Sequence, residues 1–536
     1  MTSISVILLL LILVFVGIAI ANRGSKGRPT GGGDGEDLLT YLMLAVAVGV
    51  AAFSLMNLGR AAFPTGGFIW DVEGQVATAL AGLVVAVPIA IALWRRQRIR
   101  RDLFPRSGGW TLYLTVIEAV FMTSFAVAAY GLLAWLIGDG DRVHYTDILV
   151  FGGVVAFHEF AARATPPRSG GSELPRVVGS AIGLIMLIVG STWLLTNLLE
   201  RAFGLTPMFV GPNQWGTQLA TTIVGGLIWW FRWLRPWPEP PAQARNAWTF
   251  LVATFSLATM MASLGTLVAG LLTYLLTDTR SARDFFDFVP TSIAFGLVAL
   301  AIWLHHRWRL GKDRTDPVRA YEYFSAALGL GTAVGSITVL IGAMVHRSVF
   351  VGALAPVAIY AGISLLLGLG VWYFFWNRAQ SQPEETELLA PPRRTYLLGL
   401  GALMGLTSAI ALIITLVWVF QQLLGVDTFS NQFATTITLF LGAGAASWHL
   451  LSTYNTDKAA FSTGETIAAF DVTVICSHPG LLATRFPQQA RVRVVYRGDD
   501  HGVVTDEMAD LIVTEVNNRS SYVWVDESGF RVAPSR

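Results

Sequence analysis

The sequence predicts an all-α polytopic membrane protein of about thirteen transmembrane helices: an N-terminal anchor and six tandem helical hairpins, followed by a small C-terminal α+β domain. Three observations support this fold class: the composition, the long apolar segments and a regular spacing of aromatic residues. Of the 536 residues, 54% are hydrophobic and only 13% are charged, about half the usual quarter. The mean hydropathy is +0.56. This composition excludes a soluble enzyme with one large core, a disordered chain and a disulfide-linked secreted domain.

Apolar segments long enough to cross a bilayer recur along most of the chain. A transmembrane helix needs about 20 apolar residues. Segments of about this length or longer lie near residues 4–21, 39–58, 76–94, 110–137, 146–162, 177–199, 217–233, 247–277, 288–304, 321–345, 351–376, 396–423 and 433–452. We therefore expect the lipid bilayer to be the solvent for most of the protein.

Basic residues predict how these helices are oriented. The loops after the odd-numbered spans, with the adjoining helix ends, hold 23 Lys or Arg, against 6 in the loops on the other side. This bias places the first set in the cytoplasm, the N-terminus outside and the C-terminus inside. Ala19-Ile20-Ala21 is similar to a signal-peptidase site. Cleavage there would move the Arg-rich loops outside, so we expect an uncleaved anchor.

Aromatic and basic residues mark the two ends of each predicted hairpin. The residues that open successive hairpins are Tyr41, Tyr113, Arg176, Trp248, Tyr321 and Tyr396. Those that close them are Trp94, Phe157-His158, Trp229-Trp230, Trp303, Trp372 and Trp448. The 355 residues from Tyr41 to Tyr396 make five steps of 71, which indicates parallel tandem repeats. After the anchor and linker (1–38), the predicted hairpins span 39–106, 107–174, 175–244, 245–316, 317–390 and 391–456.

These clusters carry a resemblance to a known family. The run Trp303-Leu304-His305-His306-Arg307-Trp308, the opening Arg394-Thr395-Tyr396 and the hairpin period resemble a bacterial family of tandem two-helix membrane repeats. That family is catalogued only as a domain of unknown function. The resemblance covers roughly residues 39–452 and implies an integral membrane protein without assigning an activity. Because the family is bacterial, the expected location is the cytoplasmic membrane of a bacterial cell. Three hairpins have Arg95, Arg232 and Arg378 in place of histidine, so no functional residue is carried over.

Residues 465–536 have the composition of an aqueous domain. Charged residues make up about 24% of this segment, against about 12% of the preceding chain. Alternating patterns predict strands from Phe470 and from Arg491, and Thr505 is expected to cap a helix. One or two further strands are predicted between 522 and 532. We expect Cys476, the only cysteine, to be a small buried residue.

Glu118 is the strongest candidate for a functional residue. It lies eight residues past Trp110 within a predicted span, and ionisable groups in lipid are costly enough to indicate a function. Glu118 is therefore a possible ion or proton site. The alternative is a protonated or hydrogen-bonded packing residue, and no comparable acid recurs in the other hairpins.

Four histidines are weaker candidates for metal or haem ligation. They lie at the closing ends of the second, fourth and sixth hairpins: His158, His305, His306 and His449. Neutral imidazole is a common metal ligand. However, aromatic residues and histidines are also ordinary at a membrane boundary beside arginine, and we expect no metal site and no cofactor.

Three functions remain open from the sequence. The first is a non-enzymatic scaffold or sensor whose segment 465–536 binds a cytoplasmic protein partner; the near absence of charge within the spans and the polar tail support it. The second is a transporter or channel for an ion or small solute with Glu118 in the pathway. The third and most distant is a haem- or metal-binding redox protein. No catalytic residue is predicted, and the net charge of +2 gives no reason to expect nucleic acid binding.

Overall fold

A computed structural model describes most of the chain after residue 33. The described residues are 34–63, 72–103, 108–139, 145–163, 173–205, 215–235, 243–277, 285–311, 313, 315–345, 354–381, 385–388, 390–424, 433–463, 470–476, 482–486, 490–496, 504–516, 520–526 and 529–534. The chain forms two compact parts, Met1–Ser447 and Trp448–Arg536, and each is considered by itself. The predicted first span, 4–21, lies outside the described residues.

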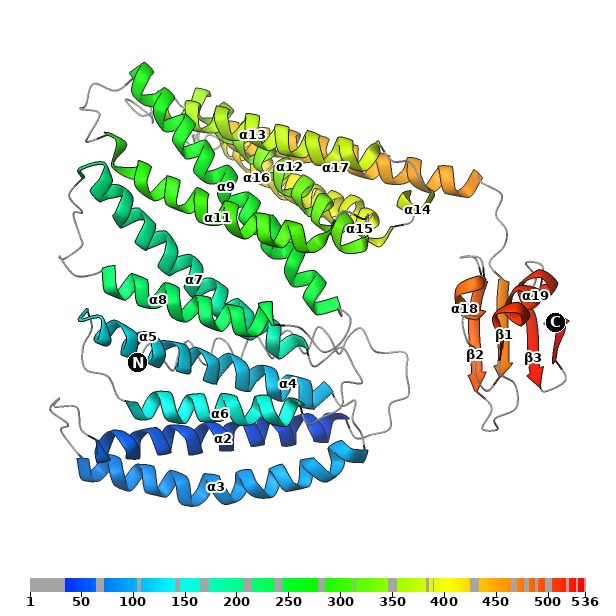
Figure 1. Ribbon diagram of the computed structural model, residues 1–536. Helices are drawn as coiled ribbons and strands as arrows, with labels where there is room; N and C mark the ends of the chain where they lie inside the picture. The colour runs from blue at the N-terminus through cyan, green and yellow to red at the C-terminus, as the bar shows by residue number, and fades with distance from the viewer. Residues whose placement is uncertain are drawn as a thin grey trace. The chain divides into compact units, whose positions relative to one another are not determined.

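The first part is built from helices (Figure 1). Their bounds are α2 Asp34–Ala62, α3 Val72–Leu103, α4 Gly108–Ile117, η1 Glu118–Met122, α5 Thr123–Leu136, α6 Tyr145–Arg163, α7 Glu173–Ala202, α8 Trp215–Trp229, η3 Trp230–Leu234, α9 Gln243–Thr277, η4 Phe286–Phe288, α11 Val289–Leu310, α12 Asp316–Val345, α13 Leu354–Gln380, α14 Glu385–Leu388, α15 Pro391–Arg394, η5 Thr395–Leu400, α16 Gly401–Leu423 and α17 Phe433–Thr463. Three of these segments, η1, η3 and η5, are π-helical.

The helices confirm the predicted polytopic membrane fold. Within the described residues, 11 helices are long and apolar enough to cross a membrane. The remaining predicted span, 217–233, coincides with α8, a 15-residue α-helix that continues directly into the π-helix η3. The long apolar helices make the chain a multi-pass membrane protein.

Consecutive long helices pack against each other as antiparallel pairs. The closest pairs are α2 with α3, α7 with α8, α9 with α11, and α12 with α13. Glycines allow the backbones to approach in two of them. A Cβ at Gly225 would lie 2.4 Å from the backbone nitrogen of Leu187, and one at Gly368 would lie 2.8 Å from that of Ala333. Small residues at such crossings are typical of membrane helices. The 71-residue repeat itself remains a prediction.

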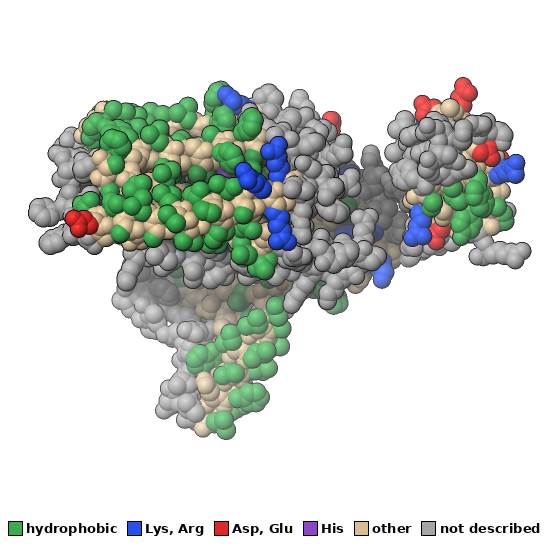
Figure 2. Space-filling model, turned by 90° about the horizontal axis from the view of Figure 1, so that it is seen from below, with side chains coloured by type: hydrophobic (Ala, Val, Ile, Leu, Met, Phe, Trp, Pro, Cys, Tyr) green, Lys and Arg blue, Asp and Glu red, His purple; other side chains and the backbone are tan. Residues whose placement is uncertain are grey.

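The outer surface of the helices is apolar, as a lipid environment requires. On α3, Val84 and Val85 have exposed fractions of 72% and 61%, and the basic residues Arg95, Arg96 and Arg98 follow further along the same helix. Figure 2 shows hydrophobic side chains covering the helices on one face, with Lys and Arg gathered toward one end of it. Apolar surface next to a basic boundary fits a bilayer and its headgroup region.

Aromatic side chains that open and close the predicted hairpins contact each other. Tyr41 lies against Tyr113 and Trp94 lies against His158, each with ring centroids 5.8 Å apart. Further along the chain, Trp303 Nε1 donates a hydrogen bond of 2.8 Å to the hydroxyl of Tyr321. The markers found in the sequence therefore pack together at the helix ends instead of only facing the bilayer boundary.

After the end of α17, the described residues of the second part form a four-stranded mixed sheet with two helices. Its elements are β1 Phe470–Cys476, α18 Leu482–Arg485, β2 Ala490–Tyr496, α19 Asp506–Val516, β3 Ser521–Asp526 and β4 Gly529–Pro534. The strand order is β2-β1-β3-β4; β1 pairs in parallel with β2 and β3, and β3 pairs antiparallel with β4. The predicted strands and helix are present, whereas α18 was not expected from the sequence.

Buried and exposed side chains alternate along the strands, so one face of the sheet is covered and the other is exposed. Val472, Val474 and Val523 are fully buried in a core that also contains residues of α18 and α19. The alternate positions form the second face, named here the exposed sheet face: Arg493, Val495, Tyr522, Trp524 and Arg531. They are aligned by the register, which places Ile475 beside both Val495 and Trp524, and Trp524 beside Arg531.

Candidate functional site

Glu118 belongs to a buried group of charged side chains in the helical part. It begins the π-helix η1 and is 8% exposed. The guanidinium of Arg232, in the π-helix η3, contacts both of its carboxylate oxygens: Nε lies 2.8 Å from Oε1, and Nη2 donates to Oε2 at 2.9 Å. The guanidinium therefore holds Glu118 through one charge-assisted hydrogen bond and one close ion-pair contact. Glu118 is thus an ion-pair partner of a residue 114 positions away.

Arg232 also contacts a second carboxylate. Its Nη1 donates to Oε2 of Glu159 on α6, and the other oxygen of Glu159 lies 3.6 Å from Nη2 of Arg176 on α7. Two acids and two arginines therefore form a cluster with no net formal charge, named here the Glu118–Arg232 cluster. Pairing of this kind offsets the large cost of removing each charge from water.

The local backbone provides the space for this cluster. A Cβ on Gly179 of α7 would lie 2.2 Å from Oε1 of Glu118 and 3.2 Å from Nε of Arg232, so a larger residue there would displace the pair. Both Glu118 and Arg232 lie in π-helical turns. Such turns are rare and occur frequently at functional sites.

The histidines that were weak metal candidates have other contacts. His158 Nδ1 lies 2.8 Å from the carbonyl of Val154 and Nε2 lies 2.7 Å from the Tyr113 hydroxyl. Because a carbonyl only accepts, Nδ1 carries the proton and Nε2 accepts from Tyr113. Both nitrogens of His158 are thereby engaged within the protein.

His306 is fully buried, and its Nδ1 donates to the carbonyl of Ile302 at 2.9 Å. Its ring stacks on Trp233 with centroids 5.7 Å apart, and the ring of His305 lies edge-on to Trp229. His449 is exposed on α17. Among the residues that the structure describes, no group of three or more His, Cys, Asp or Glu is arranged to hold a metal ion.

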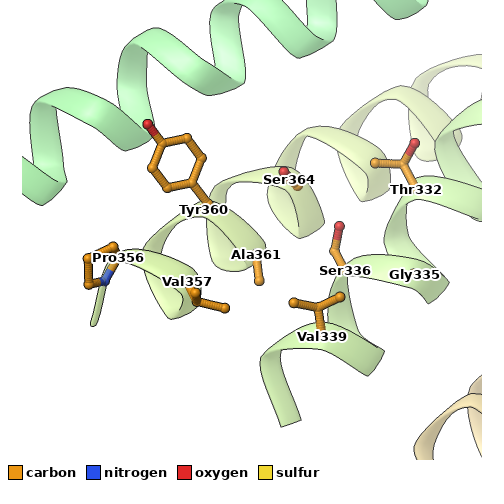
Figure 3. Close-up of a pocket in the computed structure, with 9 residues that line it drawn as sticks. All are labelled: Thr332, Gly335, Ser336, Val339, Pro356, Val357, Tyr360, Ala361 and Ser364. Atoms are coloured by element: carbon orange, nitrogen blue, oxygen red, sulfur yellow. The ribbon is translucent and has the colours of Figure 1, made fainter. Parts of the chain in front are cut away.

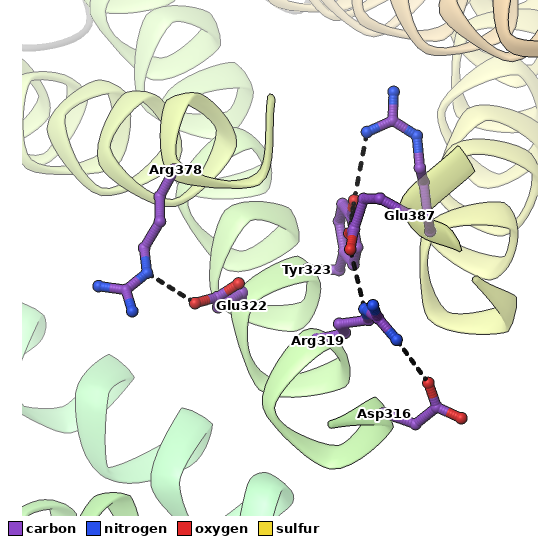
Figure 4. A network of polar contacts seen from close by, with 7 residues as sticks. Asp316, Arg319, Glu322, Tyr323, Arg378 and Glu387 are labelled. Carbon is purple, nitrogen blue, oxygen red and sulfur yellow. Dashed lines mark hydrogen bonds and ion pairs between the residues drawn. The ribbon is translucent and has the colours of Figure 1, made fainter. Parts of the chain in front are cut away.

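A second buried charge network lies around the start of α12 (Figure 4). Glu387 of α14 accepts from Arg319 Nε at 2.8 Å through one oxygen and from the Tyr323 hydroxyl at 2.8 Å through the other. Arg393 donates to the same hydroxyl at 3.3 Å, and Glu322 pairs with Arg378 at 2.8 Å. Of these charged residues only Glu322 lies within a predicted span, 321–345, so the network gathers near the helix ends, just outside the apolar segments.

Two cavities lie among the C-terminal helices of this part. One, of about 560 Å³, lies between α12 and α13 and is lined by small hydroxyl residues, including Thr332, Ser336 and Ser364 (Figure 3). The other, of about 930 Å³, is bordered by α9, α12 and the continuous α15–η5–α16 helix. Glu118 is among the described lining residues of neither cavity.

The C-terminal domain holds Cys476 in its core. The residue is fully buried, as the sequence predicted, and burial raises the pKa of its thiol. A thiol that keeps its proton is a poor nucleophile. Unlike this core, the exposed sheet face is accessible: Tyr522, Trp524 and Val495 have exposed fractions of 42%, 39% and 42%.

Comparison with known proteins finds a match to one family. Residues 37–147 match the model of a family described as a domain of unknown function (DUF5671). The DUF5671 match spans α2 to α5 and therefore includes Glu118, whereas Glu159, Arg176 and Arg232 lie beyond it. No curated protein and no solved structure matches the chain. DUF5671 carries no assigned activity, which agrees with the resemblance seen in the sequence.

The sequence alone identified Glu118 but not its partners. Arg232 follows a tryptophan pair at a helix end, which is an ordinary boundary position. One signal was available: a buried carboxylate in an apolar span requires an opposite charge nearby, and Arg232 lies at the end of another predicted span, 217–233. Nothing in the local sequence indicated that Glu159 shares this arginine.

Proposed function

We propose that the protein is a non-enzymatic membrane scaffold or sensor whose C-terminal domain binds a cytoplasmic protein partner. In this proposal the helices anchor the domain in the bacterial cytoplasmic membrane, with the domain on the cytoplasmic side. The observation that carries the proposal is the exposed sheet face. Parallel strands such as β2, β1 and β3 are usually covered on both faces, and here one face leaves Tyr522, Trp524 and Val495 accessible.

The chemistry of this face favours a protein partner. Tyr522 and Trp524 lie next to each other, with ring centroids 5.8 Å apart. The register places Arg531 beside Trp524 and Arg493 beside Thr473. Tyrosine, tryptophan and arginine are the residues most enriched where a few side chains carry most of the binding energy of a protein interface. A partner that covers these residues would complete the sheet's second apolar layer.

Site-specific photo-crosslinking in the full-length protein tests this proposal. A photoreactive residue at position 524 should form a discrete crosslinked product in native membranes, and the changes Tyr522→Ser and Val495→Ser should remove it. The matched control carries the photoreactive residue at position 511, because Leu511 is 60% exposed on α19. Absence of a product at position 524, or an equal product at both positions, would contradict the assignment.

A second candidate function is ion-coupled transport through the Glu118–Arg232 cluster. It is supported by the sharing of Arg232 between two carboxylates, because protonation of one acid would leave the other paired. Proton-coupled flux into liposomes that contain the purified protein tests this function. Flux that is lost in Glu118→Gln supports it, and unchanged flux in that variant would remove Glu118 from the pathway.

A further inference from the structure

The larger of the two cavities has the form of a groove that enters the membrane from one end. It is bordered by the starts of three helices, with Asn246 on α9, Asp316 on α12 and Thr395 at the start of η5. Its lining continues along α12 to Ala327 and along α16 to Leu403. At 1.5 Å per residue, the stretch from Asp316 to Ala327 is about 16 Å long. We refer to this cavity as the α9–α12–α16 groove.

The lining of the groove is polar at one end and apolar further in, which matches the two ends of an amphipathic ligand. The polar residues Asn246, Asp316 and Thr395 lie where the three helices begin. Deeper positions are apolar, and Phe250 and Phe324 lie together there with ring centroids 5.3 Å apart. Phe324 is 45% exposed and Leu403 is 57% exposed. Since both lie within membrane-spanning segments, this side of the groove opens toward lipid.

The charges beside the groove favour an anionic headgroup. Arg319 is ion-paired with Asp316, which lines the groove, and Arg393 donates to Tyr323, which also lines it. These two arginines balance Asp316 and Glu387. Arg245 and Arg394 directly precede the lining residues Asn246 and Thr395 and add positive charge at this end. The starts of α9 and α12 contribute the positive ends of their helix dipoles.

From these observations we propose that the α9–α12–α16 groove is a binding site for an anionic phospholipid. One acyl chain lies along Phe250, Phe324 and Leu403, and the phosphate group lies near the helix starts at Asn246 and Thr395. The volume of about 930 Å³ falls within the range of sites that enclose a small ligand. Basic residues beside the ends of membrane helices attract the phosphate headgroups of anionic lipids.

Thermal unfolding of the purified full-length protein with defined lipids tests the proposal. Phosphatidylglycerol should raise the unfolding temperature more than phosphatidylcholine with identical acyl chains. Ala327→Phe fills the groove and should remove most of this difference. Ala409→Phe is the matched control, because Ala409 is exposed on α16 and is not among the described lining residues, and it should keep the wild-type response.

A second measurement keeps the proposal falsifiable if Ala327→Phe does not fold. The smaller change Ala320→Val alters the lining at the polar end, and native mass spectrometry then counts the lipids that stay bound. Fewer retained anionic lipids than in the wild type support the groove. Equal retention in the groove variants and Ala409→Phe would overturn the site, and equal stabilisation by the two headgroups would overturn the anionic assignment.

Discussion

At the scale of single residues, the charges inside the helical part are paired in small groups. Arg232 is 3% exposed and serves Glu118 and Glu159 together, whereas Glu387 is 2% exposed and accepts from Arg319 and Tyr323. Each group matches acids with arginines, so no large net charge is buried. Removing an acid or an arginine from such a group should lower the stability of the protein by different amounts, because each removal leaves a different charge without a partner.

Removal of Arg232 should therefore destabilise the protein more than neutralisation of Glu118. Arg232→Leu leaves the buried carboxylate of Glu118 without its arginine and takes one of two arginines from Glu159, and breaking a buried pair in this way costs about 3–5 kcal/mol. Glu118→Gln keeps an acceptor oxygen for the guanidinium, and Glu159 still balances its charge. Thermal unfolding in detergent should give a much lower unfolding temperature for Arg232→Leu than for Glu118→Gln.

Arg201→Leu is the control for this comparison. Arg201 is exposed at the end of α7, and exposed charges contribute little to stability. Its unfolding temperature should stay near that of the wild type. If Arg232→Leu unfolds at the same temperature as Arg201→Leu, the Glu118–Arg232 cluster does not stabilise the fold.

Cys476 provides a residue-scale prediction about pH. Burial raises the pKa of its thiol in the folded domain, so the folded state holds the proton more tightly than the unfolded chain does. The stability contributed by the neutral thiol is present at low and neutral pH and is lost as the pH rises through the raised pKa. We expect an aromatic disulfide reagent to react slowly with the native protein and rapidly after denaturation. Fast reaction of the native protein at neutral pH would contradict this burial.

At the scale of elements, the sequence predicted those features, such as helix caps, that depend only on residues close together in the chain. Thr505 was expected to cap a helix, and its hydroxyl accepts the backbone N–H of Met508 at 3.3 Å. Local sequence does not determine which residues of α19 face the sheet. Ala509, Ile512 and Val516 are buried, whereas Leu511 is exposed, because the orientation of the helix over the sheet selects its inner face. The π-helical turns were not predicted, since they depend on packing between distant helices.

The cap of α19 can be tested without unfolding the whole chain. Thr505→Ala removes the accepting hydroxyl, and loss of an N-cap typically costs about 0.5–2 kcal/mol. Hydrogen–deuterium exchange of the full-length protein should become faster in the first turn of α19. Thr514→Ala is the control, because its hydroxyl only bonds back to the carbonyl of Asp510. Equal exchange in the two variants would show that the cap does not stabilise the helix.

At the scale of the whole molecule, composition and span length were sufficient to predict the membrane fold. They could not predict the candidate site, because its contacts cross long stretches of sequence. Glu118 and Arg232 are 114 residues apart, and Arg232 and Glu159 are 73 apart. Arg319 and Glu387 are separated by 68 residues. The aromatic markers were visible in the sequence, but their contacts with one another required the helices to be packed.

The orientation of the molecule is the prediction on which the proposed cytoplasmic partner depends. Loop charge predicts that the C-terminal domain lies inside the cell. In a Cys476→Ser background, Arg531→Cys puts one exposed thiol on the sheet, and an impermeant maleimide should label it only after the membrane is opened. Phe63→Cys, at a position 69% exposed beyond α2, should be labelled on intact cells. Labelling of Arg531→Cys on intact cells would reverse the topology, because every hairpin would then face the opposite way.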